Sequence, residues 1–272
     1  MKTELGGLTS VGRQLLGKLL RASKESFTVA EASQILDVSR YRAASLLAMW
    51  TRNGWLHRVC RGLYIPVPLQ SPSVDVTTEE PWLIAHKLFS PCYIGGWTAA
   101  HYWGLTEQIF NSIYVMTTKK VHQREQSLSG VAFKVKTVLP KKIFGTQTIW
   151  SGKVKISISD PTKTVVDGLN DPAVFGGIRM VADVLSAYIR SKEFNQSTLF
   201  EYAHVMGNSV VYKRLGFLVE LLKFDGANAI VLVCKDNLKS GYSQLDPATP
   251  GDRLETRWNL WVPKSFNIKD QA

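Results

Sequence analysis

The chain has 272 residues, of which 45% are hydrophobic and 20% charged, so it has room for two folded domains and is too apolar to be a disordered chain. Its 33 lysines and arginines outnumber its 22 acidic residues, and the net charge of +11 favours a polyanionic partner, either nucleic acid or an anionic membrane surface. No apolar run reaches the roughly 18–20 residues that cross a bilayer, no secretory segment follows Met1, and Cys60, Cys92 and Cys234 form no CxxC pair or disulfide spacing. We therefore expect a reduced, cytoplasmic protein without a membrane partner.

Three helices are predicted near the start of the chain. Residues 9–22 place leucines at helical spacing. Thr28 can cap a second helix, because Glu31 follows three residues later in a capping-box pattern. Ser39 can cap a third helix, which Gly54 ends, since glycine readily takes the left-handed backbone found after many helices.

A β-hairpin is predicted directly after the third helix. Two runs of alternating polarity, residues 55–59 and 63–65, flank the glycine-containing turn Cys60-Arg61-Gly62. Two helices joined by a short turn and followed by such a hairpin are typical of a winged helix-turn-helix. We therefore assign residues 1–70 to a winged helix-turn-helix domain that binds DNA.

A second domain is predicted to follow. Residues 71–80 are rich in proline, serine and threonine, which is typical of a linker, and residues 81–272 are expected to form a mixed α/β domain, so the predicted fold class is α+β. The strands expected there cover residues 112–117, 131–138, 153–158, 228–233 and 257–262. The helices expected there cover residues 80–89, 97–103, 160–169, 177–191, 197–204 and 209–223.

The third helix is the expected recognition helix, because the N-terminal residues of that helix meet base edges in the major groove. Arginine at this place can make a bidentate bond with guanine or contact a phosphate, and the sequence leaves open which of the two occurs. Arginines on the hairpin would lie along the DNA backbone or the minor groove. The residues that we expect to contact DNA are Thr28, Ser39, Arg40, Tyr41, Arg42, Ser45, Arg52, Arg58 and Arg61.

The basic charge is concentrated in this first domain. Residues 1–70 hold ten basic and four acidic side chains, so +6 of the net +11 lies there. The alternative is a protein-binding module, in which the same arginines form a solvated face. Two further basic clusters are expected on the solvated surface, where either would be able to extend a DNA or RNA footprint: Lys119-Lys120 with His122 and Arg124, and Lys213-Arg214.

Few sequence patterns in this chain are typical of a catalytic site. Asp160 and Asp167 are seven residues apart on one predicted helix with Lys163 between them, a set that a metal-dependent nuclease would use. Asp160 is equally well explained as a helix cap. The five histidines show no metal-ligand spacing, and no nucleophile motif such as GxSxG is present. We expect no catalytic residue, metal or cofactor, and keep the nuclease as an alternative.

Several motifs, in this order, make the chain resemble the AbiEi antitoxin family. They are Arg61-Gly62-Leu63-Tyr64, residues 93–105 (YIGGWTAAHYWGL), residues 159–169 (SDPTKTVVDGL), Arg214-Leu215-Gly216-Phe217, residues 245–247 (LDP) and residues 257–260 (RWNL). The resemblance covers nearly the whole chain. The proline-rich linker and the tail from Lys264 to Ala272 have no counterpart in the family pattern.

The resemblance implies a transcriptional regulator of a bacterial abortive-infection toxin–antitoxin pair. The first domain would repress its own operon by binding repeats in double-stranded operator DNA, with several copies associating cooperatively. The second domain would act as the antitoxin against a nucleotidyltransferase-like toxin, which such antitoxins usually counter without a stable complex. Direct docking of the second domain onto a partner protein, which it would mask, stays open as an alternative.

Overall fold

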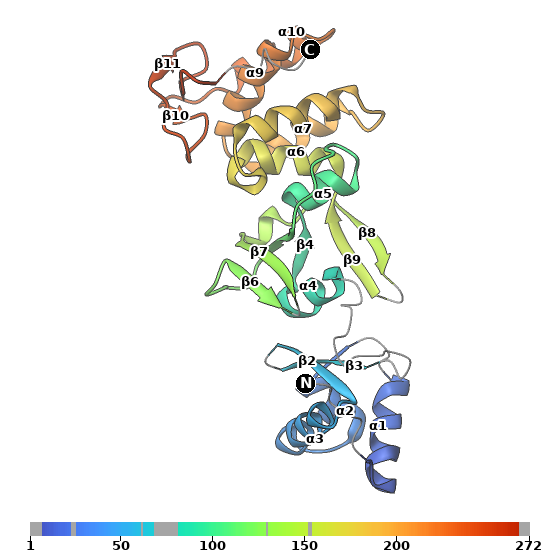
Figure 1. The fold of residues 1–272 in the computed structure, drawn as a ribbon. Helices are drawn as coiled ribbons and strands as arrows, with labels where there is room; N and C mark the ends of the chain where they lie inside the picture. Colours follow the sequence, from blue (N-terminus) through green and yellow to red (C-terminus); the bar gives the residue numbers. More distant parts are fainter. Residues whose placement is uncertain are drawn as a thin grey trace. The chain divides into compact units, whose positions relative to one another are not determined.

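A computed structural model shows a mixed α+β fold, with ten α-helices and three sheets in the part of the chain that it describes (Figure 1). The described residues are 7–22, 26–60, 62–67, 81–128, 130–151 and 154–266. The predicted α+β class is confirmed at this level. The chain divides into two compact units: residues 1–81 with 127–131, and residues 82–126 with 132–272. The predicted linker, residues 71–80, lies outside the described residues.

The first unit consists of three helices and a small antiparallel sheet. The helices are α1 (Ser10–Ala22), α2 (Val29–Leu36) and α3 (Arg40–Arg52). The strands, in spatial order, are β1 (Phe27–Thr28), β3 (Leu63–Pro66) and β2 (Leu56–Cys60). The three predicted helices and the two hairpin strands are confirmed. Strand β1 is not predictable from periodicity, because two residues are too few to show alternation.

One apolar core joins the three helices of this unit. Leu19 of α1, Ala32 of α2 and both Leu47 and Trp50 of α3 have no exposed surface. Burying a side chain of leucine size contributes roughly 1.5–3 kcal/mol, so these contacts fix the orientation of α3. Gly54 follows α3 with a φ of 78°, as the sequence predicts for the residue after the helix.

A six-stranded mixed sheet lies at the centre of the second unit. Its strands are β4 (Cys92–Ile94), β5 (Ser112–Thr117), β6 (Glu125–Leu128), β7 (Val131–Thr137), β8 (Thr146–Ser151) and β9 (Val154–Ser159). Their spatial order is β6-β7-β5-β4-β9-β8. The pairs β5–β7 and β4–β9 are parallel, whereas β4–β5 and β8–β9 are antiparallel. The predicted strands at 112–117, 131–138 and 153–158 are confirmed as β5, β7 and β9.

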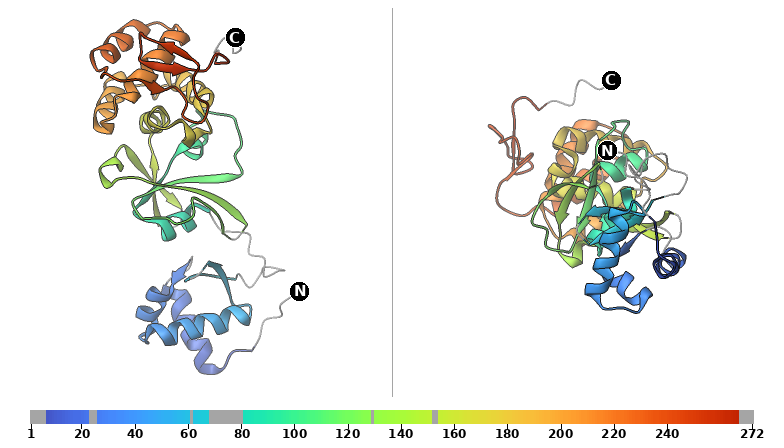
Figure 2. Two further views of the ribbon diagram at one scale, coloured as in Figure 1. Left: turned by 90° about the vertical axis from the view of Figure 1, so that its left-hand side faces the viewer. Right: turned by 60° about the horizontal axis from the view of Figure 1, so that its bottom comes forward.

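Helices cover both faces of this sheet (Figures 1 and 2). The ring of Phe89 on α4 lies 6.0 Å from Phe133 of β7 on one face. On the other face the Tyr93 hydroxyl of β4 donates to Asp167 of α6 at 2.9 Å. The six predicted helices of this unit are confirmed to within two residues. They are α4 (Pro81–Phe89), α5 (Gly96–Tyr102), α6 (Pro161–Asn170), α7 (Ile178–Arg190), α8 (Gln196–Met206) and α9 (Val210–Leu222).

The prediction of a strand at residues 228–233 is wrong, because this apolar run belongs to helix α10 (Ala227–Asp236). Ile230, Val231 and Cys234 are buried at helical spacing, whereas Leu232 between them is 63% exposed. Short apolar runs do not distinguish a strand from a helix, and packing against α9 decides here. Of the strand predicted at 257–262, only Leu260–Val262 is formed; this is β12, the middle strand of a small sheet with β10 (Ser243–Gln244) and β11 (Arg253–Glu255).

The expectation that Lys213 and Arg214 lie on the solvated surface is also wrong. Their exposed fractions are 2% and 3%. The Arg214 guanidinium on α9 connects the C-terminal end of α6 to the segment of β10. The last carbonyls of a helix have no hydrogen-bond partner within the helix. The guanidinium donates hydrogen bonds of 2.8–3.0 Å to the backbone carbonyls of Leu169, Asn170, Gln244 and Leu245. Burial lowers the pKa of this guanidinium to about 10.

Candidate nucleic-acid interface

Helix α3 has one face in the core and one face in solvent. Its core face consists of Ala43, Leu46, Leu47 and Trp50, all buried. The opposite face is centred on Tyr41, Ser45, Ala48 and Arg52, with Arg40, Arg42 and Met49 beside them, and all seven are exposed. This exposed α3 face carries three arginines and no carboxylate. The face opposite the apolar side of a surface helix is usually charged or polar, and here its charge is entirely positive.

The first turn of α3 concentrates this charge where a helix favours anions. The Ser39 hydroxyl accepts a 3.3 Å hydrogen bond from the backbone N–H of Arg42, which confirms Ser39 as the N-cap. Arg40 and Arg42 follow, although cations near a helix N-terminus oppose the helix dipole. Tyr41 between them is 88% exposed. The two arginines therefore do not stabilise the helix through its dipole.

A tight connection sets the angle between α2 and α3. Asp37 adopts the left-handed conformation, with a φ of 56°, and the backbone N–H of Val38 donates to the Ser33 carbonyl at 3.1 Å. The Ser33 hydroxyl in turn donates to the Val38 carbonyl at 2.6 Å. These reciprocal bonds fix the turn that presents the start of α3.

Thr28, a predicted DNA contact, caps α2. Its hydroxyl oxygen accepts from the Glu31 backbone N–H at 3.2 Å, and the Glu31 carboxylate accepts from the Thr28 backbone N–H at 2.7 Å. This reciprocal pair is the capping box that the sequence predicts. The structure therefore gives the Thr28 side chain a structural role apart from the exposed α3 face.

Thr28→Ala is expected to lower the free energy of unfolding of the first unit by about 1 kcal/mol, because the cap hydroxyl is lost. Urea denaturation followed by tryptophan fluorescence measures this change. Thr28→Ser retains the oxygen and serves as the control with near-natural stability. Unchanged stability of Thr28→Ala, together with weaker DNA binding, would mean that the hydroxyl contacts DNA instead.

The remaining predicted residues lie on the hairpin. Arg58 is an exposed residue of β2 whose register partner is Tyr64 of β3. The ladder shifts register between Arg58 and Cys60, and Gly62 takes a φ of 89° at the turn. Arg61 lies outside the described residues. The structure thus gathers Ser39, Arg40, Tyr41, Arg42, Ser45 and Arg52 on or at the start of one helix and places Arg58 on a separate element.

The three residues of the nuclease alternative have structural partners. The Asp160 carboxylate accepts from the Lys163 backbone N–H at 2.7 Å and from the Tyr202 hydroxyl at 2.8 Å. Burial is the main cause that raises the pKa of Asp160. Lys163 has no exposed surface, and its ammonium pairs with Asp167 while also donating to the Tyr93 hydroxyl at 3.0 Å. Within the described ranges, no group of three or more histidine, cysteine or acidic side chains is placed to hold a metal ion.

Comparisons with known proteins give a fold and no family. No family model and no curated protein matches the chain. The crystal structure of the RV2827C protein from Mycobacterium tuberculosis is similar, with a TM-score of 0.61 and 13% sequence identity over 95% of this chain and 93% of that one. At this identity the likeness concerns the fold alone. No helix in the described ranges is long and apolar enough to cross a membrane.

Proposed function

We propose that the first unit is a winged helix-turn-helix that binds double-stranded DNA, with α3 in the major groove and the β2–β3 hairpin as the wing. The observation that carries the proposal is the exposed α3 face, which holds three arginines, an 88% exposed tyrosine and no carboxylate. A phosphate backbone supplies the negative charge that such a face lacks.

The place of each side chain on α3 or on the hairpin decides which part of the DNA we propose that it contacts. Arg40 and Arg42 at the N-terminal turn are placed to meet base edges, where arginine pairs with the O6 and N7 acceptors of guanine. Ser39 and the free backbone N–H groups of the first turn suit a phosphate. Arg52 at the far end of α3 and Arg58 on the wing suit flanking phosphates. Phosphate contacts give affinity and register, whereas the two N-terminal arginines give specificity.

We further propose that the chain is a repressor of its own operon, and that the second unit acts as an antitoxin against a nucleotidyltransferase-like toxin. The sequence motifs shared with the AbiEi family support this extension. Cooperative binding of several chains to operator repeats belongs to the same proposal. A DNA-binding first unit is the part of it that α3 supports directly.

A protein-docking module is the second candidate. Tyr41 and Met49, 88% and 38% exposed, add apolar area to the exposed α3 face, and aromatic and arginine side chains are also enriched in protein interfaces. A partner that co-purifies through size exclusion and is released by Tyr41→Ala would favour this function. The same chain would then show no preference among DNA sequences.

Binding of the full chain to a double-stranded fragment is expected to weaken steeply with salt. Arg52→Gln removes one proposed phosphate contact, so it should weaken binding to all sequences alike and reduce the salt slope by about 1. Fluorescence anisotropy at several salt concentrations measures both quantities. Arg190→Gln, which removes an exposed arginine of the second unit, is the matched control and should leave the slope unchanged. Equal slopes for Arg52→Gln and the natural chain would remove Arg52 from the interface.

A further inference from the structure

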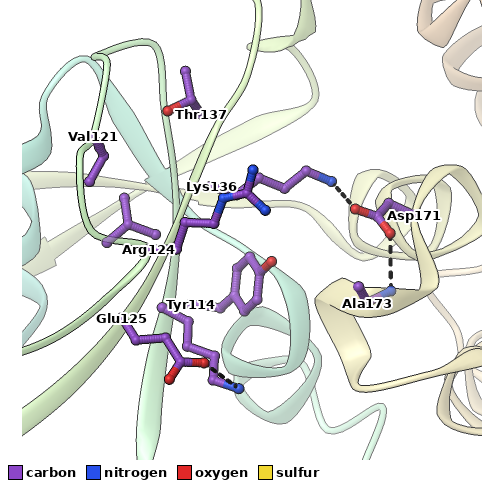
Figure 3. Close-up of a pocket in the computed structure, with 10 residues that line it drawn as sticks. Tyr114, Val121, Arg124, Glu125, Lys136, Thr137, Asp171 and Ala173 are labelled. Atoms are coloured by element: carbon purple, nitrogen blue, oxygen red, sulfur yellow. Dashed lines mark hydrogen bonds and ion pairs between the residues drawn. The ribbon is translucent and has the colours of Figure 1, made fainter. Parts of the chain in front are cut away.

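A cavity of about 530 Å³ opens on the second unit, separate from the proposed DNA interface (Figure 3). Tyr114 of β5 and Lys134 and Lys136 of β7 share the sheet face that lines it, since Tyr114 is the register partner of Lys134. The 3-10 helix η2 (Pro172–Phe175) and the preceding Asp171 close another side, and Arg124 and Glu125 close a third. The volume falls within the range of about 300–1,000 Å³ that is usual for small-molecule sites.

The cations around this cavity outnumber the carboxylates. Lys136 forms an ion pair with Asp171, and the Lys134 ammonium lies 3.3 Å from the Glu125 carboxylate. Arg124 is the third cation; it is exposed, and no described side chain forms an ion pair or a hydrogen bond with its guanidinium. Figure 3 shows the Arg124 side chain turned toward Lys136 and Tyr114. The cavity therefore holds one positive charge, on a fork of N–H donors, without a counter-charge.

Tyr114 adds a second hydrogen-bond donor on the cavity lining. Tyr114 as a whole is only 8% exposed, and its hydroxyl forms no hydrogen bond with the residues that the structure describes. In Figure 3 this hydroxyl points into the space between Arg124 and Asp171. Burial, reinforced by the negative charge of Asp171, raises the pKa of Tyr114 to about 12, so the hydroxyl keeps its proton at neutral pH. The protonated hydroxyl can therefore donate to a ligand in the cavity.

We propose that this cavity binds the phosphate group of a small phosphorylated molecule. Arg124 is the bidentate donor to two phosphate oxygens, with the Tyr114 hydroxyl and the remaining N–H donors of Lys136 beside it. Val121 offers an apolar wall to the rest of the ligand. The single excess charge and the limited volume favour a small molecule over a nucleic-acid strand. This inference does not depend on the proposed DNA binding.

Calorimetric titration of the full chain with inorganic phosphate and with ATP, as a nucleotide-sized probe, tests the proposal. We expect one site per chain, which Arg124→Gln weakens about tenfold or more because a charged hydrogen-bond donor is lost. Tyr114→Phe, which keeps the packing, should weaken it several-fold. Lys120→Gln is the charge-matched control from the same loop, and Arg13→Gln is the control from the first unit; both should bind as the natural chain does.

Three results would overturn the assignment. Absence of heat with both probes would show that the cavity binds no phosphate group. Equal binding by Arg124→Gln and Lys120→Gln would place the phosphate elsewhere. A single-stranded dT10 oligonucleotide that binds through Arg124 while ATP does not would assign the site to a nucleic-acid strand.

Discussion

A chain carrying both Arg40→Ala and Arg42→Ala is expected to bind its DNA site roughly 2–6 kcal/mol more weakly, because each lost base contact costs about 1–3 kcal/mol. Its preference for that site over unrelated DNA should flatten as well. Both side chains are exposed and lie where the helix dipole disfavours cations, so the fold should keep its stability. Anisotropy titrations on specific and unrelated duplexes, with thermal unfolding alongside, measure the three quantities.

Arg13→Ala and Arg21→Ala together are the matched control, since they remove two exposed arginines of α1 in the same unit. They should reduce affinity much less and leave the preference between duplexes intact. If the α3 double variant retained its affinity and preference, α3 would not be the recognition helix.

Arg214→Ala is expected to destabilise the second unit by about 3 kcal/mol or more, because a buried carbonyl left without its donor costs about 1–3 kcal/mol. Four backbone carbonyls lose their donor, and two of them belong to the C-terminal end of α6. Arg214→Lys should recover only part of the loss, because a single ammonium cannot match the planar fork of five N–H donors. Urea denaturation of the full chain, followed as a separate transition of the second unit, measures the change.

Arg253→Ala removes an exposed arginine from the same unit and should alter stability by less than about 0.5 kcal/mol. If Arg214→Ala cost no more than this control, the four hydrogen bonds would contribute little. Such a result would show that water replaces the guanidinium at the carbonyls.

Local signals predict much of this fold. The capping box at Thr28, the cap at Ser39 and the Asp160-Pro161 start of α6 act within a few residues, so the sequence contains them completely. Helices with a clear apolar face, such as α7, are likewise placed to within a residue or two. These elements form where short-range hydrogen bonding and periodicity agree.

Long-range packing accounts for what the sequence does not predict. Residues 228–233 have strand-like composition but pack as helix α10 against α9. Lys213 and Arg214 look like surface charges until distant carbonyls surround them, and the buried Lys163 ammonium donates to the hydroxyl of the distant Tyr93. Charge alone does not reveal such partners, because the contacts join distant segments, such as Tyr93 and Asp167, which are 74 residues apart.

In the candidate interface, too, local signals predict some features and the packing of distant segments determines others. The exposed residues of α3 follow from helical periodicity, so the sequence predicts Arg40, Tyr41, Arg42, Ser45 and Arg52 on one side of the helix. Thr28 is polar, like the other residues expected to contact DNA, but its hydroxyl takes part in the cap of α2. Polarity alone does not distinguish these two roles. The sequence marks Arg124 as part of a basic cluster, but the cavity that Arg124 shares with Tyr114 depends on three separate elements meeting.

The central claim is that the first unit recognises DNA by sequence. Its most direct test is a mobility-shift titration of the full chain on the DNA upstream of its own gene, against an unrelated fragment of equal length, at about physiological salt, where nonspecific binding is weak. We predict tight, stepwise shifts with the upstream fragment only. Equal and weak binding to both fragments would contradict the claim and leave the exposed α3 face as a docking surface for protein.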